Sequence, residues 1–430
     1  MTNAPLRIGV AGLGTVGAGV LKIFAAHQDQ LNARSGRPLE VVAVSARNKN
    51  KDRGVDVSGF SWEDDPVALA RRGDVDLVIE VIGGSDGPAK AATEAALARG
   101  AHVVTANKAM MAVHGGHLAQ LAETHGASLR FEAAVAGGVP IIKALGEGLA
   151  ANKMRRVYGV LNGTCNYILT EMQKSGRDYL DILADAQELG YAEADPTADV
   201  GGWDAAHKLA LLAALGFGCK VDFAGVSVEG IERISLPDIQ FAAELGYRVK
   251  LVGVAEMSEQ GLSQRVAPCL LPADSAIGAL DGVTNAVVCE GDFIGQTVYE
   301  GPGAGEGPTA SAIVGDVIDI GRGGVRPTFG VPASDLSSAA QRPEDSLASA
   351  YYLRLTVIDK PGVLAQVTKV LGDAAVSIDQ MRQIGRQPDA ATVLVVTHEA
   401  AHGQVRDAVD QISRLDVSLA EPIALTIERA

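Results

Sequence analysis

The sequence predicts an α/β chain with a doubly wound parallel sheet, an α+β region and a small C-terminal domain of ferredoxin-like order. Three observations support this fold class. Strand-like apolar runs alternate with helical segments over residues 1–130, longer helices and β-rich sequence follow, and residues 350–430 have the order βαββαβ. The length of 430 residues also favours two or three domains over a single core.

The N-terminal strands are near-continuous runs of valine, isoleucine and leucine, which suit a parallel sheet covered on both faces. Strands are expected at residues 6–11, 39–45, 75–82, 102–105 and 128–131. Periodicity near 3.6 predicts helices between them, at residues 17–27, 66–72, 88–99 and 116–125.

The pattern changes after residue 139. Helices are expected at residues 166–174, 180–187, 203–215 and 311–320, with β-rich sequence at 249–299. The polar stretch 334–349 predicts a linker. In the last domain, strands are expected at 351–358, 376–383, 392–397 and 423–427, and helices at 363–372 and 401–414.

Composition excludes several classes of function. A net charge of −15 disfavours nucleic acid as a partner, because phosphate binding needs a basic surface. The four cysteines show no metal-ligand spacing and suit a reducing compartment. Neither a signal peptide nor an apolar run of about 20 residues is evident, so we expect a cytoplasmic protein without a membrane partner.

A glycine-rich turn follows the first expected strand and precedes the first helix. The motif GxGxxG is formed by Gly12, Leu13, Gly14, Thr15, Val16 and Gly17. In this context the glycines permit the turn, the approach of a pyrophosphate and close helix packing. The alternative is a glycine turn without a ligand. A Rossmann-type dinucleotide-binding domain is therefore predicted for residues 1–135, and the helix within 305–325 is expected to pack back on it.

The end of the second strand lacks the acid that usually reads the ribose of NAD. It carries cations instead, namely Arg47, Lys49 and Lys51. Cationic side chains suit a 2′-phosphate, so we expect NADP, although a solvated basic loop would accept NAD as well. Further cofactor contacts are expected at later strand ends, from Gly84, Ser85, Thr105 and Lys108.

The stretch ADPTADVGGWDAAHKL, residues 194–209, gathers carboxylates around one amine. In a helix starting near Trp203, Asp204 and Lys208 are four residues apart and share a face. A solvent-exposed ion pair of this kind on a helix contributes only about 0.3–0.5 kcal/mol to stability and would have no functional meaning. Gly201-Gly202 and the nearby acids Glu193, Asp195 and Asp199 argue for a site instead. Such a group would suit a zwitterionic substrate.

This region resembles the signature of homoserine dehydrogenase at every fixed position. The matching residues are Ala186, Gly190, Tyr191, Ala192, Asp195, Pro196, Asp199, Val200, Gly202, Asp204 and Lys208. The resemblance covers about the first 330 residues, including the glycine-rich loop and residues 162–166 (NGTCN). With no aspartokinase region ahead of it, the chain resembles the monofunctional form.

The resemblance implies reversible NAD(P)H-dependent reduction of L-aspartate 4-semialdehyde to L-homoserine, in threonine, methionine and isoleucine biosynthesis. It implies that Lys208 donates the proton, that Asp204 orients it and contacts substrate, and that Lys108 positions cofactor or substrate. The other substrate contacts implied are Glu193, Asp199, Tyr191, Thr164 and Gly163, and further cofactor contacts are Gly190 and Gly305. Residues 136–304 would form the catalytic and dimerisation domain.

The same family resemblance extends to FEAAVAGGVP, residues 131–140. It implies a structural monovalent cation, sodium being the first candidate, bound by Glu132 and the carbonyls of Val135, Gly137 and Val139. The residues alone would assign Glu132 only to a loop.

Residues 350–430 resemble an ACT domain, a ligand-sensing module, through DKPGVLA and the later Val376-Ser377-Ile378. The resemblance implies an amino-acid effector, threonine first, at Asp359, Pro361, Gly362, Val363 and Leu364, where helix amides could meet a carboxylate. A dimerisation module without a ligand is the alternative. ACT domains commonly pair, so a homodimer or homotetramer is expected.

Two rival functions compete with this interpretation. Aspartate-semialdehyde dehydrogenase needs a nucleophilic cysteine with an acid–base partner. Cys165 is the candidate here, but its surroundings, NGTCN, differ from that family's motif and no histidine partner is evident. A non-enzymatic nucleotide sensor would require loss of Asp204 or Lys208, and both are present.

Overall fold

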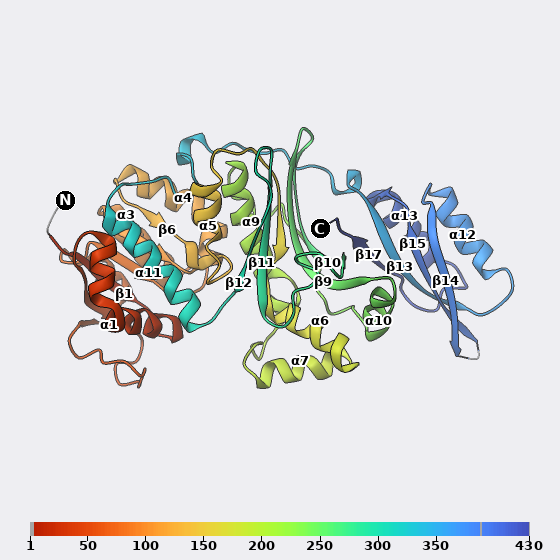
Figure 1. Ribbon diagram of the computed structural model, residues 1–430, viewed down its shortest axis with the longest axis horizontal. Helices are drawn as coiled ribbons and strands as arrows, with labels where there is room; N and C mark the ends of the chain where they lie inside the picture. Colours follow the sequence, from red (N-terminus) through yellow and green to blue (C-terminus); the bar gives the residue numbers. More distant parts are fainter. Residues whose placement is uncertain (1–3, 388, 430) are drawn as a thin grey trace.

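The computed structural model describes residues 4–387 and 389–429. They form two sheets with helices around them, in an elongated arrangement (Figure 1). A parallel sheet occupies the N-terminal end, a long mixed sheet the centre, and the C-terminal domain the opposite end. Within the described ranges, no helix is both long and apolar enough to cross a membrane.

The N-terminal sheet confirms the predicted doubly wound topology. Its six parallel strands lie in the order β3-β2-β1-β4-β5-β6. Their bounds are Leu6–Ala11 (β1), Leu39–Ser45 (β2), Ser61–Glu63 (β3), Leu77–Glu80 (β4), His102–Thr105 (β5) and Leu129–Arg130 (β6). The central strands are fully covered, as their apolar sequence predicts. The short edge strand β3 was not predicted from sequence.

Helices cover both faces of this sheet. They are α1 (Thr15–Ser35), α2 (Pro66–Arg71), α3 (Pro88–Ala98), α4 (Lys108–Thr124) and, from far along the chain, α11 (Glu306–Arg322). Helix α11 packs against α1, where a side chain on Gly19 would lie 2.7 Å from Glu306 Cγ. Glycine in α1 therefore lets the two helices approach closely.

Helix α4 begins eight residues before the predicted segment 116–125. Its N-cap is Asn107, whose side chain accepts from the Met110 amide. Gly115 and Gly116, at the predicted start, lie in the middle of the helix. A Cβ on Gly115 would come within 3.0 Å of the Phe329 ring, so tertiary packing accounts for that glycine. Lys108 consequently lies in the first turn of α4.

The central sheet is mixed. Its strands in this region are β7 (Met154–Val160), β8 (Ser227–Val228), β9 (Tyr247–Ser258), β10 (Gly261–Pro272), β11 (Thr284–Gly291) and β12 (Gly295–Pro302). Antiparallel pairing joins β12-β11-β7-β9-β10. The helices here are α6 (Gly163–Ser175), α7 (Tyr179–Glu188), α8 (Thr197–Val200), α9 (Trp203–Phe217) and α10 (Leu236–Glu244). Helix α9 is buried between this sheet and α4, and it thus connects both halves of the molecule.

A short irregular region joins the two sheets. It consists of the 3₁₀ turn η1 (Glu132–Ala134), the helical turn α5 (Ile141–Lys143) and the wider π turn η2 (Ala144–Gly148).

The C-terminal domain has the predicted ferredoxin-like order. Strands β13 (Ala348–Ile358), β14 (Ile378–Gln387), β15 (Ala390–Thr397) and β17 (Ile423–Ile427) pair as β17-β13-β15-β14, with α12 (Val363–Asp373) and α13 (His402–Ser413) beside them. A two-residue strand, β16 (Ala400–Ala401), was not predicted. Strand β17 also pairs in parallel with β10, so this domain extends the central sheet.

The polar segment 334–349 connects the two regions while hydrogen-bonding to the central sheet. The Leu262 amide donates to Ala340 and the Arg342 amide donates to Leu262, at 2.8 Å each. Two 3₁₀ turns, Ala333–Asp335 (η3) and Glu344–Ser346 (η4), flank this contact. Composition alone suggested a free linker and did not show these bonds.

Candidate active site

The centre of the candidate active site is the pair Asp204 and Lys208, one turn apart on α9. The Lys208 ammonium donates to Asp204 Oδ2 and to the carbonyl of Leu161, at 2.8 Å each. The two residues are only 9% and 8% exposed. This burial distinguishes the pair from a solvent-exposed ion pair, because its charges are largely withdrawn from water.

A second ammonium reaches the same carboxylate. Lys108 Nζ, from the first turn of α4, lies 3.0 Å from Asp204 Oδ1. A cation is unfavourable at a helix N-terminus, where the macrodipole is positive, whereas a carboxylate is favourable there. Asp204 lies in the first turn of α9, so its charge is favoured and compensates for Lys108. Contact between α4 and α9 brings the two residues together.

Attraction to the two lysines keeps the Asp204 carboxylate ionised. Burial on its own would raise the pKa of Asp204, but Lys208 and Lys108 overcome that effect and hold it below its ordinary value. The same attraction to Asp204 raises the pKa of the half-buried Lys108 against the opposing effect of desolvation. Asp199 behaves differently, since burial raises its pKa and Asp204 adds to the effect. Two ammonium groups therefore share one fixed carboxylate.

Asn162 connects the carboxylates, a role that the sequence interpretation missed. Its Nδ2 donates to Asp199 Oδ1 at 2.8 Å and to Asp204 Oδ2 at 2.9 Å. Its Oδ1 caps helix α6 by accepting from the Cys165 amide. Asparagine preceding a glycine at a helix start was the available signal, because that residue type favours N-caps.

Asn285 is a second missed residue. Its Nδ2 donates to Leu161 O at 3.0 Å, the carbonyl that also holds Lys208. It comes from β11, far from the motif in sequence, and nothing in the local pattern indicated it.

The remaining expected substrate residues surround this centre less tightly. Thr164 Oγ1 donates to the carbonyl of Tyr191 at 2.6 Å, and Tyr191 lies edge-on to Tyr167. Gly163 packs closely on the backbone of residue 283. Glu193 is exposed, and its carbonyl accepts from the Gln187 side chain at 3.0 Å. Gly190, an expected cofactor residue, lies in the exposed turn before Tyr191.

Asp195, one of the acids that drew attention to this stretch, turns away from the centre. Its carboxylate accepts from the amide and hydroxyl of Thr197, so it closes the turn that leads into α8. Of the acids that are close together in the sequence, Asp199 and Asp204 lie at the centre of the site.

The glycine-rich loop has the geometry that a dinucleotide requires. A Cβ on Gly12 would lie 2.5 Å from Val81 O, and one on Gly17 would lie 2.0 Å from Gly12 O. A Cβ on Gly14 would meet nothing within 4 Å, so this glycine faces open space. The loop therefore fits a pyrophosphate at the N-terminus of α1, beside Leu13, Thr15 and Val16.

The basic loop after β2 folds beside the glycine-rich loop. Arg47, Lys49 and Lys51 are all exposed, and Lys49 lies over the Trp62 ring. Arg53, which the sequence interpretation omitted, donates to Leu13 O at 3.1 Å and ties the two loops together.

The next two strand ends are joined by a buried carboxylate, Glu80. It accepts from the Ile82 amide at 2.7 Å and from Thr105 Oγ1 at 2.5 Å. The Asn107 side chain donates to Gly84 O, while Ser85 bonds Asp86. The Thr105 hydroxyl is thus occupied internally, by Glu80 and by the Asn107 amide.

The expected cation ligand Glu132 is buried beside Asp316. Its carboxylate oxygens accept from the Ile142 and Lys143 amides, at 2.8 and 2.9 Å. Burial, with a smaller contribution from Asp316, raises the pKa of Glu132 to about 7. Each carboxylate oxygen keeps a lone pair for a hard cation, so the donor chemistry fits. Within the described residues, no cluster of three acidic, histidine or cysteine side chains forms a metal site.

The loop after Glu132 runs through two left-handed residues, Ala136 and Gly137, with φ of 53° and 52°. The Val139 carbonyl accepts from Ile141, and Gly137 approaches the backbone of residue 303 closely. Val135, the remaining expected ligand, is buried. Gly305, an expected cofactor residue, caps α11 nearby with φ of 115°.

In the C-terminal domain, the expected effector turn precedes α12. Gly362 caps the helix in a left-handed conformation, and Val363 is buried beneath it. Asp359 accepts from Gln383 at 3.1 Å, while Pro361 is exposed and Leu364 half-buried.

Cys165 has the properties of an inert thiol. It is fully buried, its Sγ bonds the carbonyl of Asp199, and burial raises its pKa well above the ordinary value. A nucleophilic cysteine needs the opposite shift.

Comparisons with known proteins agree with this site. The model of the homoserine dehydrogenase NAD-binding domain matches residues 12–132, that of homoserine dehydrogenase matches 140–318, and the ACT domain model matches 351–417. A homoserine dehydrogenase of Neisseria gonorrhoeae is 41% identical over 96% of both chains.

Solved structures give the same result. A homoserine dehydrogenase from Thiobacillus denitrificans superposes with a TM-score of 0.94 at 40% identity, covering 99% of this chain and 98% of that one. A hyperthermophilic archaeal homoserine dehydrogenase in complex with NADPH has a TM-score of 0.62 at 25% identity, covering 74% of this chain and 97% of that one. The chain belongs to the homoserine dehydrogenase family of oxidoreductases, with a C-terminal ACT domain.

Proposed function

We propose that the chain reduces L-aspartate 4-semialdehyde reversibly to L-homoserine, with Lys208 as the proton donor. The supporting observation is the hydrogen bonding of Lys208. An ammonium has three N–H donors, and described residues take two of them, Asp204 and the Leu161 carbonyl. The third is left for the substrate oxygen, which gains negative charge as the aldehyde is reduced.

The roles of the surrounding residues follow from charge. Asp204 holds the Lys208 ammonium in place and lies beside the substrate, and Glu193 offers its carboxylate to the substrate's ammonium group, with Asp199 nearby. Lys108 is 40% exposed at its side chain and can reach a substrate carboxylate or the cofactor. Glu193, Tyr191, Thr164 and Gly163 complete the substrate contacts. A bound nicotinamide supplies the hydride.

The decisive assay is reduction of NADP with L-homoserine present and absent. We expect reduction that depends on L-homoserine and does not depend on phosphate. Oxidation of the semialdehyde that requires phosphate, and that is lost in Cys165→Ser, would favour the rival dehydrogenase instead.

We infer a preference for NADP over NAD. The exposed cations Arg47, Lys49 and Lys51 beside the glycine-rich loop support it, because they match a 2′-phosphate. We expect the KM for NADP to be lower than that for NAD, and the two to converge in Arg47→Ala. A clear NAD preference in the unaltered chain would contradict the inference.

We infer that Glu132 and the carbonyls of Val135, Gly137 and Val139 bind a monovalent cation, sodium first. The chemistry that supports it is a buried carboxylate beside a second acid, Asp316, where a cation would relieve repulsion. Sodium chloride should raise the thermal midpoint more than tetramethylammonium chloride at equal ionic strength. Glu132→Gln should abolish that difference.

We infer feedback control by an amino acid, threonine first, and assembly as a homodimer or homotetramer. The ACT domain supports the control, since its sheet is continuous with the catalytic sheet through β17 and β10, and the pairing common among ACT domains supports the assembly. Titration of L-threonine into the full-length enzyme should lower homoserine oxidation, and absence of any effect would leave the domain as a dimerisation module. The placement of an effector on Asp359, Pro361, Gly362, Val363 and Leu364 stays a prediction.

A further inference from the structure

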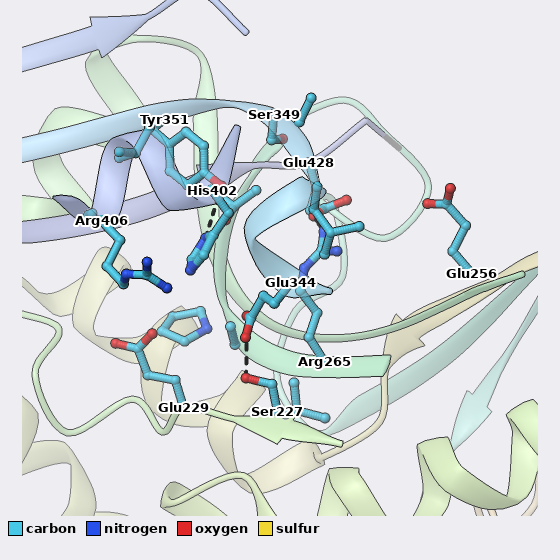
Figure 2. A pocket seen from close by; sticks show the side chains of 18 of the residues that line it. Ser227, Glu229, Glu256, Arg265, Glu344, Ser349, Tyr351, His402, Arg406 and Glu428 are labelled. Atoms are coloured by element: carbon cyan, nitrogen blue, oxygen red, sulfur yellow. Dashed lines mark hydrogen bonds and ion pairs between the residues drawn. The ribbon is translucent and has the colours of Figure 1, made fainter. Parts of the chain in front are cut away.

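A cavity of about 850 Å³ lies where the ACT domain meets the central sheet (Figure 2). One edge of β10 pairs with β8 at Arg265 and Val266, and then with β17 from Cys269 onward. The cavity is lined by residues around this exchange of partners, together with η4 and α13. Both the catalytic region and the ACT domain therefore form its walls.

Most charges on these walls are paired with one another. Glu428 pairs with Arg156 at 2.7 Å and also with Arg265, and Arg342 pairs with Glu256. The charges of these side chains therefore compensate one another within the wall.

The end beside α13 differs. Glu229 has no ion-pair partner within 4 Å among the described residues, because the nearby Arg233 pairs with Glu421 instead. Desolvation raises the pKa of Glu229, against the smaller opposing effect of Arg233. Glu344 accepts only a 3.3 Å bond from the Ser227 hydroxyl. In Figure 2 the side chains of Glu229, His402 and Arg406 point into the same space. His402 is fixed by a 3.1 Å bond to the Tyr351 hydroxyl.

This end offers both signs of charge. Glu229 and Glu344 can accept from an ammonium group, and Arg406 keeps free N–H donors beside the two aspartates that it pairs with, Asp345 and Asp407. His402 can donate from its second ring nitrogen. We propose that this end of the cavity binds a small α-amino acid, with its ammonium at Glu229 and Glu344 and its carboxylate at Arg406 and His402.

The cavity wall is also in contact with the active site. The Glu229 amide donates to Val266 O, and two residues later the Ile231 amide donates to Val200 O at 2.9 Å. A Cβ on Gly202, which has φ of 83°, would lie 3.2 Å from both Val228 and Val266. Strand β8 thus separates the cavity from the glycine turn that starts α9. An occupant that shifts β8 would move Asp204 and Lys208, which gives the coupling a physical path.

The proposal rests on the proposed amino-acid control and names a site for it. Calorimetry should measure binding of L-threonine, L-isoleucine and L-methionine separately to the full-length enzyme, to Glu229→Gln and to Asp359→Asn. For whichever amino acid binds, Glu229→Gln should weaken affinity by about tenfold or more, the loss expected for one charge-assisted hydrogen bond. Asp359→Asn, at the other candidate position, should retain the affinity of the unaltered enzyme.

Homoserine oxidation is measured on the same samples. Glu229→Gln should retain basal kcat and shift inhibition to higher amino-acid concentration, in step with its binding. Equal affinity in Glu229→Gln and the unaltered enzyme would overturn the proposal, as would failure of all three amino acids to bind. Loss of binding in Asp359→Asn alone would overturn the proposal. Amino-acid control would then be assigned to the turn before α12 that contains Asp359. Binding at the cavity without any change in oxidation would overturn the coupling through β8.

Discussion

Asp204 lies between two ammonium groups, and this arrangement determines what the other polar residues must do. Both oxygens of the carboxylate are occupied, by Lys208 and Asn162 on one side and by Lys108 on the other. Removing one partner of a buried ion pair is costly, because it leaves the other charge in a poorly solvated place. The sequence predicted this pair from spacing alone, since residues four apart in a helix share a face. It did not predict Asn162 or Asn285, which matter only through tertiary proximity.

Asn162→Ala tests the importance of that bridge. Loss of Nδ2 removes the donor shared by Asp199 and Asp204, so the two carboxylates repel each other and Lys208 is less well fixed. We expect kcat/KM for L-homoserine to fall by about tenfold or more, with a helix-cap loss of about 1 kcal/mol in stability. Steady-state kinetics and urea unfolding measure the two effects. Unchanged kcat/KM would show that Asn162 serves only as a cap.

At the level of helices and strands, sequence patterns found most elements and misplaced some ends. The bounds of β1, β2 and β5 agree with the buried runs that predicted them. The start of α4 and the end of α1 were each misplaced by eight residues, and β7 and α10 were not predicted. The reason for Gly115 is the distant ring of Phe329, and a contact of that kind has no local signature. The pairing of β10 with β17 between the two regions could not be predicted either, because the pattern of a strand does not specify its partner.

The two glycines of α4 form a matched pair for measurement. Gly116 is exposed with nothing within 4 Å of its would-be Cβ, so Gly116→Ala should stabilise the fold by up to about 1 kcal/mol through helix propensity. Gly115→Ala adds the same propensity but presses on Phe329 at 3.0 Å, so its gain should be smaller or reversed. Urea unfolding of both variants compares them directly. An equal gain in the two would show that the Phe329 contact imposes no constraint.

Across the whole molecule, the ACT domain is held to the catalytic region by both backbone and charge. Besides the pairing of β10 with β17, the fully buried Asp238 of α10 receives Arg354 and the Tyr352 hydroxyl from β13. The two regions therefore should unfold together. The sequence indicated separate domains and a polar connection, and its pattern did not indicate this attachment.

Arg354→Leu tests the attachment. Asp238 would keep its capping contacts with Ser235 and the hydroxyl of Tyr352 but lose its only cation among the described residues, and we expect a loss of about 3 kcal/mol, typical of breaking a buried pair. Adding Asp238→Asn to that variant should recover part of the loss, because the unpaired charge is gone. Unfolding by denaturant is followed by tryptophan fluorescence and by far-ultraviolet circular dichroism. A single transition with the same midpoint in both signals would support coupled unfolding. Two separate transitions in the unaltered chain would contradict it.

The measurement that most directly tests the role of Lys208 is single-turnover kinetics of Lys208→Ala with NADP and L-homoserine, with and without added ethylamine. Loss of a positioned acid–base group should slow turnover by about two to four orders of magnitude, and the small amine should restore part of it. The dissociation constant for NADPH should stay close to that of the unaltered chain, and Lys220→Ala, on an exposed lysine just beyond α9, should be fully active. Near-normal turnover in Lys208→Ala would contradict the account, and so would a rate loss explained entirely by weakened NADPH binding.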